Sequence, residues 1–450
     1  MKKLLFIFLF LPTLTQAQLS WYVVGSPGFS AGGAAGISLA IDRSGMPYVA
    51  FEDVGDSDKA TVMKYNGSSW VNVGSEGFST QGASGLSIVI DNNGTPYVVY
   101  EDQATGGNTM VMKYNGSSWA PVGIGAVSTY GSGYSSMAID SSGSPYVVYE
   151  DNQLKATVMK YDGSSWVAVG SPGFSDSDAI YTNIAIDGSG TPYVVYSDFA
   201  HNRKATVMKY NGSSWVPVGS AGFSAGVVVY TSIVLDTGGM PYVVYQDYGN
   251  QGKATVMKYD GSSWADVGSA GFSADSVGNH PTMAIDSSSN TPYVAYHDAG
   301  NNKATVMKYN GSSWVAVGSS GLSAGASWPS AIAINDNGIP YVVYPDSIYG
   351  WKATVMRYGF PDGAKNIDKD TYSLTIYPNP NIGQMTVAFA TEGYHTLQVY
   401  NCIGNNVYTT MLTGTEKNTD IDLQKLPPGV YYLHAVSSSE SENVRFVIER

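Results

Sequence analysis

A segment of about 50 residues recurs seven times in this chain of 450 residues. Each copy carries a tryptophan followed three residues later by Val-Gly, and these markers are Trp21, Trp70, Trp119, Trp166, Trp215, Trp264 and Trp314. Successive markers are 47 to 50 residues apart. A unit this short cannot bury its own hydrophobic face, so the copies must stack on one another.

Every copy contains four short apolar stretches. In the neighbourhood of the third copy they are SSMAID (135–140), PYVVYED (145–151), ATVMKY (156–161) and WVAVG (166–170). They are rich in Val, Ile, Tyr and Thr and are bounded by Gly, Ser, Asn, Asp or Pro, which indicates strands. Four strands per unit, repeated seven times, predict an all-β fold, a seven-bladed β-propeller. A β-solenoid is the alternative architecture.

The two ends of the repeat array complement each other. The array opens on the stretch Trp21–Gly25 and closes on Ala353–Tyr358, so the first unit has a surplus strand and the last unit lacks one. We expect the N-terminal strand to pair beside Ala353–Tyr358 and to close the ring, which would hide sheet edges from aggregation. A solenoid would not need such ends. The predicted propeller spans residues 18–358.

The residues that the copies share have structural interpretations. Asn66-Gly67 and its equivalents suit tight hairpins, because Asn-Gly and Asp-Gly supply positive φ. In the turn Asp140–Tyr146 and its equivalents, the leading carboxylate is expected to accept backbone N–H groups. The repeated tryptophans and the tyrosine pairs, such as Tyr97 and Tyr100, are expected to fill gaps between blades. Sugar stacking is the alternative role for these aromatic residues.

A second acid ends the PYVVYED-like stretch of each unit: Asp53, Asp102, Asp151, Asp198, Asp247, Asp298 and Asp346. A lysine opens the next stretch in six of the seven units, which favours an ion pair at the neck of the loop. The alternative is calcium, whose preferred ligands are carboxylate oxygens. The candidate ligands are Asp53, Asp56, Asp58, Asp176 and Asp178. The sequence requires no cofactor, and calcium is the one ion these loops could hold.

The copies differ in the loops on the face opposite the shared turns. A single variable face around the axis of a propeller is a natural place for ligand binding; unconstrained drift of the loops is the alternative. Trp328 and Trp351 are the two tryptophans outside the repeat positions, and Tyr349 lies beside them in sequence. The other ligand-binding candidates are Tyr130, Tyr134, Phe199, His201, Tyr248, His280 and His297.

Few signatures of catalysis are present. The pattern Gly-x-Ser-x-Gly occurs around Ser30, Ser224 and Ser323, but in repeated loops rather than between a strand and a helix. No zinc or phosphate-binding motif appears, and no pair of acids is singled out for glycoside hydrolysis. The formal net charge of −13 disfavours nucleic acid as a partner. The sequence therefore favours a protein that is not an enzyme.

The N-terminal residues 1–17 have the pattern of a secretory signal peptide: Lys2 and Lys3, an apolar run, and Thr-Gln-Ala before the expected cut. No later stretch is apolar enough to span a membrane. The chain has one cysteine, Cys402, so an exported protein of this sequence is held together without internal disulfides.

The repeat pattern ends after residue 358, and the sequence that follows is different. Residues 359–370 form a polar linker, and residues 371–450 read as short strands of a small Ig-like β-sandwich. These last residues resemble the type A C-terminal sorting domain of type IX secretion substrates. The resemblance lies in Tyr377, Pro378, Asn379, Pro380, Gly383, Gly404, Leu426, Gly429 and Tyr431, together with Leu397-x-Val399-Tyr400 and Asp422-Leu423. It implies passage through the outer membrane of a Gram-negative cell by the type IX machinery.

Together these features predict a secreted or cell-surface propeller, monomeric and without a transmembrane segment, that binds a glycan or another extracellular macromolecule in the manner of an adhesin. The first alternative is a secreted enzyme acting on polysaccharides, a glycosidase or a lyase. The second is a structural component of the surface layer without a discrete ligand.

Overall fold

The computed structural model describes residues 19–278, 280–328, 331–359, 374–389, 393–401, 404–437 and 441–449. The chain forms two compact units, of which one spans Val23–Tyr358 and the other contains the chain from Gly359. The predicted signal peptide, Cys402 and nearly all of the predicted linker lie outside the described residues. No helix in these ranges is long and apolar enough to cross a membrane.

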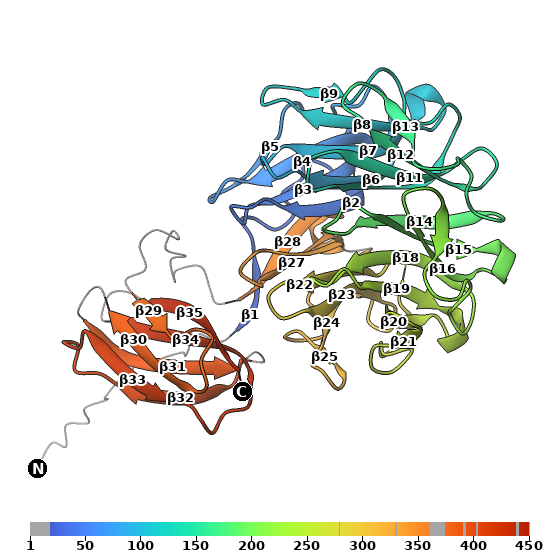
Figure 1. Cartoon of the computed structure of the whole chain (residues 1–450). Helices are drawn as coiled ribbons and strands as arrows, with labels where there is room; N and C mark the ends of the chain where they lie inside the picture. The colour runs from blue at the N-terminus through green and yellow to red at the C-terminus, as the bar shows by residue number, and fades with distance from the viewer. Residues whose placement is uncertain are drawn as a thin grey trace, which may run out of the picture. The chain divides into compact units, whose positions relative to one another are not determined.

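The repeat unit forms seven successive four-stranded antiparallel sheets, as the sequence predicts (Figure 1). Six of these blades are β2–β5 (Ala34–Ile41, Pro47–Asp53, Lys59–Tyr65, Trp70–Asn72), β6–β9 (Ala83–Ile90, Pro96–Asp102, Asn108–Tyr114, Trp119–Pro121), β10–β13 (Gly133–Ile139, Pro145–Glu150, Ala156–Tyr161, Trp166–Ala168), β14–β17 (Ala179–Ile186, Pro192–Asp198, Lys204–Tyr210, Trp215–Pro217), β18–β21 (Val228–Leu235, Pro241–Asp247, Lys253–Tyr259, Trp264–Asp266) and β22–β25 (Thr282–Asp286, Thr291–Asp298, Lys303–Tyr309, Trp314–Ala316).

The seventh blade is closed by the N-terminal strand. It contains β26 (Ala331–Ile334), β27 (Pro340–Asp346) and β28 (Lys352–Gly359), and β1 (Ser20–Val23) adds the fourth strand beside β28. The N–H of Val24 donates to the carbonyl of Val355, and the N–H of Ala353 donates to Ser30 Oγ, at 2.9 and 3.0 Å. The first strands of successive blades lie side by side, and β26 returns to β2. The predicted ring closure is therefore confirmed, and these first strands surround the propeller axis.

The repeated aromatic residues pack between blades. The indole N–H of Trp70 donates to the carbonyl of Val24 in the preceding unit, at 2.7 Å. The ring of Phe29 stacks on Trp70 with the ring centroids 4.0 Å apart, and five of the repeated tryptophans have such a phenylalanine partner. The repeated indoles therefore join each blade to the one before it.

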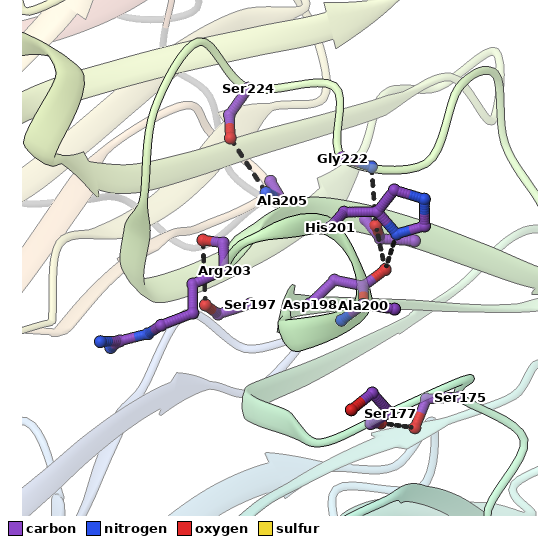
Figure 2. A network of polar contacts seen from close by, with 11 residues as sticks. Ser175, Ser177, Ser197, Asp198, Ala200, His201, Arg203, Ala205, Gly222 and Ser224 are labelled. Atoms are coloured by element: carbon purple, nitrogen blue, oxygen red, sulfur yellow. Dashed lines mark hydrogen bonds and ion pairs between the residues drawn. The ribbon is translucent and has the colours of Figure 1, made fainter.

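The shared polar residues also have structural partners. The Oδ1 of Asp140 accepts the N–H groups of Ser142 and Ser144, as expected for the first turn. In the Gly-x-Ser-x-Gly pattern, Ser224 is 2% exposed; its Oγ accepts the N–H of Ala205 and donates to the carbonyl of Gly226 (Figure 2). This serine has no free hydroxyl, so the pattern is a loop anchor.

The acid that ends each second strand fixes the loop that follows. Asp198 accepts the N–H of Ala200 at 2.9 Å and the hydroxyl of Thr206 at 2.7 Å. Its equivalents Asp53, Asp102, Asp247 and Asp346 likewise cap short 3-10 turns, which are η1 (Val54–Asp56), η2 (Gln103–Thr105), η3 (Phe199–His201), η4 (Tyr248–Asn250) and η5 (Ser347–Tyr349).

The ion pair that we expected at the loop neck is wrong. Ion pairs in the described ranges join Lys59 to Asp56, Lys160 to Asp140, His201 to Asp198 and Lys258 to Asp236. None joins a loop-neck acid to the lysine that opens the next strand. The backbone N–H groups of the turn lie closer to the carboxylate than the solvated lysine does, so they take its oxygens.

The C-terminal unit is a small β-sandwich. One sheet contains β29 (Leu374–Tyr377), β30 (Gln384–Phe389) and β33 (Asn418–Asp422); the other contains β31 (Tyr394–Asn401), β32 (Asn406–Met411), β34 (Gly429–Ser437) and β35 (Ser441–Ile448). Inward-facing residues from both sheets, among them Leu397, Leu433 and Phe446, form its buried core.

Candidate functional site

The first strand of each blade carries a position where the copies differ. In the first five blades a bulge shifts the pairing of this strand with the next one. In these five blades the bulge residue has positive φ and is Gly36, Gly85, Tyr134, Tyr181 or Tyr230. His280, which also has positive φ, occupies the equivalent position just before the first strand of the sixth blade. Holding a non-glycine residue in this conformation costs about 1–3 kcal/mol. Four blades accept that strain where two use glycine, which indicates a role for the side chains.

These four side chains form one row, which we call the aromatic arc: Tyr134, Tyr181, Tyr230 and His280. Successive ring centroids are 4.6, 4.6 and 4.2 Å apart, with the rings tilted against one another. The phenols of Tyr134 and Tyr230 lie close enough to that of Tyr181 to act on its pKa. Burial raises the pKa of all three phenols, so they remain protonated at neutral pH. The arc follows the inner strands across four consecutive blades.

The histidine at the end of the arc is neutral. The ring of His280 keeps contact with solvent but is surrounded by protein on several sides, which lowers its pKa to about 4. A neutral imidazole has one donor and one acceptor nitrogen. The arc therefore presents aromatic faces and hydroxyl or imidazole groups, without formal charge, at neutral pH.

A second aromatic group, the indole cluster, contains His297, Trp328 and Trp351. The ring centroids of Trp328 lie 6.0 Å from those of both His297 and Trp351. Trp328 is 51% exposed and Trp351 is 39% exposed, whereas His297 is buried. Trp351 ends its loop with positive φ, at the position that Arg203 occupies in the fourth blade. The structure therefore brings together the two indoles that the sequence analysis singled out.

Three blades place a glutamate near the axis. At the next-to-last position of the PYVVYED-like stretch the copies have Glu52, Glu101, Glu150, Ser197, Gln246, His297 and Pro345. Burial, reinforced by neighbouring acids, raises the pKa of Glu52 and that of Glu150 to about 7. The pKa of Glu101 is also raised by burial. The carboxylates thus lie on the first three blades, and the arc extends from the third blade to the sixth.

The hydrogen-bond partners of these glutamates differ. The backbone N–H of Gly85 acts on Glu52 and partly offsets the rise in its pKa. Glu101 accepts the hydroxyl of Ser84 at 3.1 Å, and backbone N–H groups of the next blade's bulge also lower its pKa. Glu150 is 7% exposed, and its carboxylate accepts no hydrogen bond from any residue that the structure describes. Its oxygens are not among the buried side-chain atoms that lack a partner, so they keep contact with solvent and a ligand donor can reach them.

The remaining candidates lie apart from the arc. The Nδ1 of His201 lies 2.8 Å from Oδ2 of Asp198, so this histidine stabilises its own loop (Figure 2). The guanidinium of Arg203 extends away from that pair (Figure 2). Phe199 lies under the guanidinium of Arg203 at 5.4 Å. Tyr130, Tyr248 and Tyr349 are exposed on the loops.

The calcium candidates have no geometric support. The described part of the chain holds no group of three or more His, Cys, Asp or Glu side chains placed to bind a metal ion. Of the candidate ligands, Asp53 caps η1 and Asp56 pairs with Lys59. The residues present therefore do not form the oxygen cage that calcium needs.

Sequence reasoning missed Glu52, Glu101, Glu150, Tyr181 and Tyr230, because they lie in strands and we looked for differences in loops. A signal was available. In copies that otherwise repeat almost letter for letter, these two strand positions change from blade to blade. Aligning strand positions as well as loops would have found them.

The face of the shared turns has grooves between blades. One, with a volume of about 460 Å³, is lined by Tyr48, Lys64, Tyr97 and Lys113 among others, and a second of about 370 Å³ is lined by equivalent residues around Tyr242 and Lys258. The ammonium groups of Lys64 and Lys258 lie over the rings of Tyr48 and Tyr242. These residues recur in other blades and already contact one another, so the grooves follow from the stacking of identical units.

In the C-terminal unit, the motif residues hold the fold. The Oδ1 of Asn379 accepts the N–H of Val447 at 2.9 Å, which ties the Tyr-Pro-Asn-Pro segment to the last strand. Gly383 has a φ of +93°, and a Cβ there would lie 2.8 Å from the backbone of Gln424. The hydroxyl of Tyr431 donates to the carbonyl of Pro427 at 2.8 Å, four residues upstream.

Residues 375–449 match the family described as the secretion system C-terminal sorting domain. The C-terminal unit is a type IX secretion sorting domain. The sorting domain makes this a secreted or cell-surface protein of a Gram-negative bacterium and gives it the type IX machinery as a partner. Among curated proteins, none matches the chain significantly.

Solved structures resemble the chain in fold. The BP39L lectin from Burkholderia pseudomallei has a TM-score of 0.54 and 13% identity, covering 75% of this chain and 97% of the lectin. A polysaccharide lyase of family PL25, an ulvan lyase, has a TM-score of 0.49 and 13% identity over 76% of this chain and 95% of its own. AofleA from Arthrobotrys oligospora has a TM-score of 0.47 and 12% identity over 67% and 91%. At such identities only the propeller fold is shared.

Proposed function

We propose that this protein is a non-catalytic, adhesin-like binding protein, delivered to the cell exterior by its sorting domain, whose propeller recognises a glycan through the aromatic arc and the indole cluster. It acts as a monomer and needs no cofactor. The repeated residues build the ring, and the blade-specific residues around the axis bind the ligand.

One observation carries this proposal: four consecutive blades place an aromatic side chain at an equivalent position where φ is positive. Glycine is the low-cost residue there, and Gly36 and Gly85 occupy the position in the first two blades. The backbone at Tyr134, Tyr181 and Tyr230 is strained, and the side chains of these residues do not belong to a hydrophobic core. Strain that persists without a packing reason is typical of functional positions.

The chemistry of the surface suits carbohydrate. Aromatic faces stack on the apolar faces of sugar rings, and the phenol and imidazole groups at their edges bond sugar hydroxyls. The partly exposed indoles of Trp328 and Trp351 supply a second stacking platform. A protein described as a lectin shares the fold, so the fold itself is compatible with sugar binding.

A glycan array tests the proposal. Protein comprising residues 18–450 is compared with the double variant Tyr181→Gly/Tyr230→Gly, which removes two rings and relieves the strain, so folding is retained. We expect specific signals from the wild type and their loss in the variant. Unchanged array signals in the variant would contradict the proposal. Release of shortened or unsaturated sugars would instead favour the polysaccharide-acting enzyme. Repeating the array with a chelator measures whether binding depends on calcium.

A further inference from the structure

We propose that the glycan bound at the arc carries an ammonium group, as an amino sugar does, and that Glu150 is the residue that selects it. This inference rests on the proposed glycan function and names the class of sugar. The site consists of the carboxylate of Glu150 and the ring of Tyr134 in the third blade, which are close enough for Glu150 to raise the pKa of Tyr134. The ring of Tyr181 from the fourth blade packs against that of Tyr134.

The third blade has both a glutamate near the axis and an aromatic residue at the bulge. Blades one and two combine a glutamate with glycine at the bulge, namely Glu52 with Gly36 and Glu101 with Gly85. Blades four to six combine an aromatic bulge residue with Ser197, Gln246 or His297. Among the described bulge positions, the third blade alone has both, Glu150 and Tyr134. A carboxylate beside an aromatic face is the pair of groups that recognises an ammonium.

The carboxylate of Glu150 has room for a donor. It is 7% exposed, and no described residue donates a hydrogen bond to it. Its oxygen Oε2 lies 3.4 Å from the place where a Cβ on Gly133 would stand, directly before Tyr134 in the chain. By contrast, Glu101 accepts the hydroxyl of Ser84 at 3.1 Å, and the backbone N–H of Gly85 acts on Glu52. A carboxylate that keeps contact with solvent and accepts no bond from a described residue is a ready partner for a ligand N–H.

The charges around Glu150 favour a cation over a neutral donor. The charged groups that act on it are Asp178 in the loop that leads to the fourth blade, Asp151 next in the chain and Glu101 of the second blade, all acidic. Arg203 acts on Tyr181 and is not among the groups that act on Glu150. An ammonium would offset this negative charge, whereas a sugar carboxylate or sulfate would add to it. Charge-assisted hydrogen bonds are also about twice as strong as neutral ones.

A matched series of probes tests the inference. Three oligosaccharides share one glucan backbone, in this case cellohexaose, and differ at carbon 6: the parent alcohol, the 6-amino-6-deoxy form and the 6-carboxylate. The alkyl ammonium remains protonated at pH 7.5, as in lysine. Binding to the full mature chain is measured by calorimetric titration at that pH. We expect the amino form to bind at least tenfold more tightly than the alcohol, and the carboxylate to bind most weakly.

Variants assign the preference to one residue. In Glu150→Gln the preference for the amino form should fall below about threefold, and Glu150→Ser, which copies the residue of the fourth blade, should behave alike. The matched control Glu52→Gln should keep the preference. Equal binding of amino and neutral forms by the wild type, or an unchanged preference in both Glu150 variants, would overturn the inference while leaving glycan binding intact. Failure of all three probes to bind would count against the glycan function and the inference together.

Discussion

The hydroxyl of Thr182 donates a hydrogen bond to the backbone carbonyl of Tyr134 across the junction of two blades, at 2.5 Å. The next junction repeats the contact, from Thr231 to Tyr181. Two of the strained aromatic residues of the arc, Tyr134 and Tyr181, are thus held by a threonine of the following blade. The arc is a preorganised surface, because the bond fixes the backbone from which each ring projects.

Replacing Thr182 with valine should loosen the arc at Tyr134. The change keeps the shape of the side chain but leaves a carbonyl at the blade junction without its donor, which costs about 1–2 kcal/mol in the free energy of unfolding. We expect a threefold to tenfold weaker binding of the array-identified glycan. The control Thr182→Ser keeps a hydroxyl and should retain most of the affinity. Equal affinities for valine and serine variants would show that this bond does not organise the site.

Replacing Glu150 with glutamine should stabilise the protein at alkaline pH. Burial raises the pKa of Glu150 from 4.5 to about 7. The folded state therefore binds more protons, and the wild type loses stability as the pH rises from about 4.5 through 7. We expect the variant to gain about 1–2 kcal/mol over the wild type at pH 8, allowing for solvent screening, and little at pH 4.5. Chemical denaturation at both pH values measures the difference; a gain independent of pH would contradict the assigned pKa.

The two kinds of tryptophan should respond oppositely to substitution. Trp215 donates to the carbonyl of Val169 at 2.7 Å and stacks on Phe174, so Trp215→Phe should cost about 1–3 kcal/mol of stability and leave binding unchanged. Trp328 is 51% exposed, so Trp328→Ala should weaken binding and barely change the melting temperature. Thermal melts and glycan titrations of both variants give the comparison. A stability loss at Trp328 as large as that at Trp215 would make the indole cluster part of the core.

The sorting domain should be required for export to the cell surface. A Cβ at Gly383 would lie 2.8 Å from the backbone of Gln424, so Gly383→Val should distort the sandwich. We expect this variant, and a deletion from residue 366 onward, to remain in the periplasm. The neighbouring change Ile382→Ala, at a side chain 61% exposed, should leave export intact. Surface protease accessibility in whole cells separates these outcomes, and surface display of the deletion would contradict the sorting role.

The fold was predictable from the sequence because each strand of the repeat is short, alternating and bounded by turn residues. The complementary ends, Trp21–Gly25 and Ala353–Tyr358, predicted the closure that the pairing of β1 with β28 confirms. The loop-neck ion pair was predicted wrongly, because charge alone did not reveal that Asp198 and its equivalents bond the N–H groups of their own turns.

The site was predicted in part. Tyr134, His280, His297, Trp328 and Trp351 were candidates because they differ between copies or lie in loops. Their grouping could not be predicted from the sequence. It depends on a backbone conformation with positive φ, which directs one side chain from each blade so that these side chains form a row. Unpaired Glu150 could not be found either, because pairing is a property of neighbours from other blades.

The central claim is that blade-specific residues at the axis bind the ligand and that repeated residues only build the ring. The most direct measurement is a calorimetric titration of the array-identified glycan against two variants on opposite faces. Tyr181→Gly removes a ring from the arc, and Lys64→Ala/Lys113→Ala alters the groove of about 460 Å³ between repeated residues. We predict at least a tenfold loss of affinity in the first variant and a change of less than twofold in the second. The reverse result would contradict the account and place the binding site in the repeated grooves.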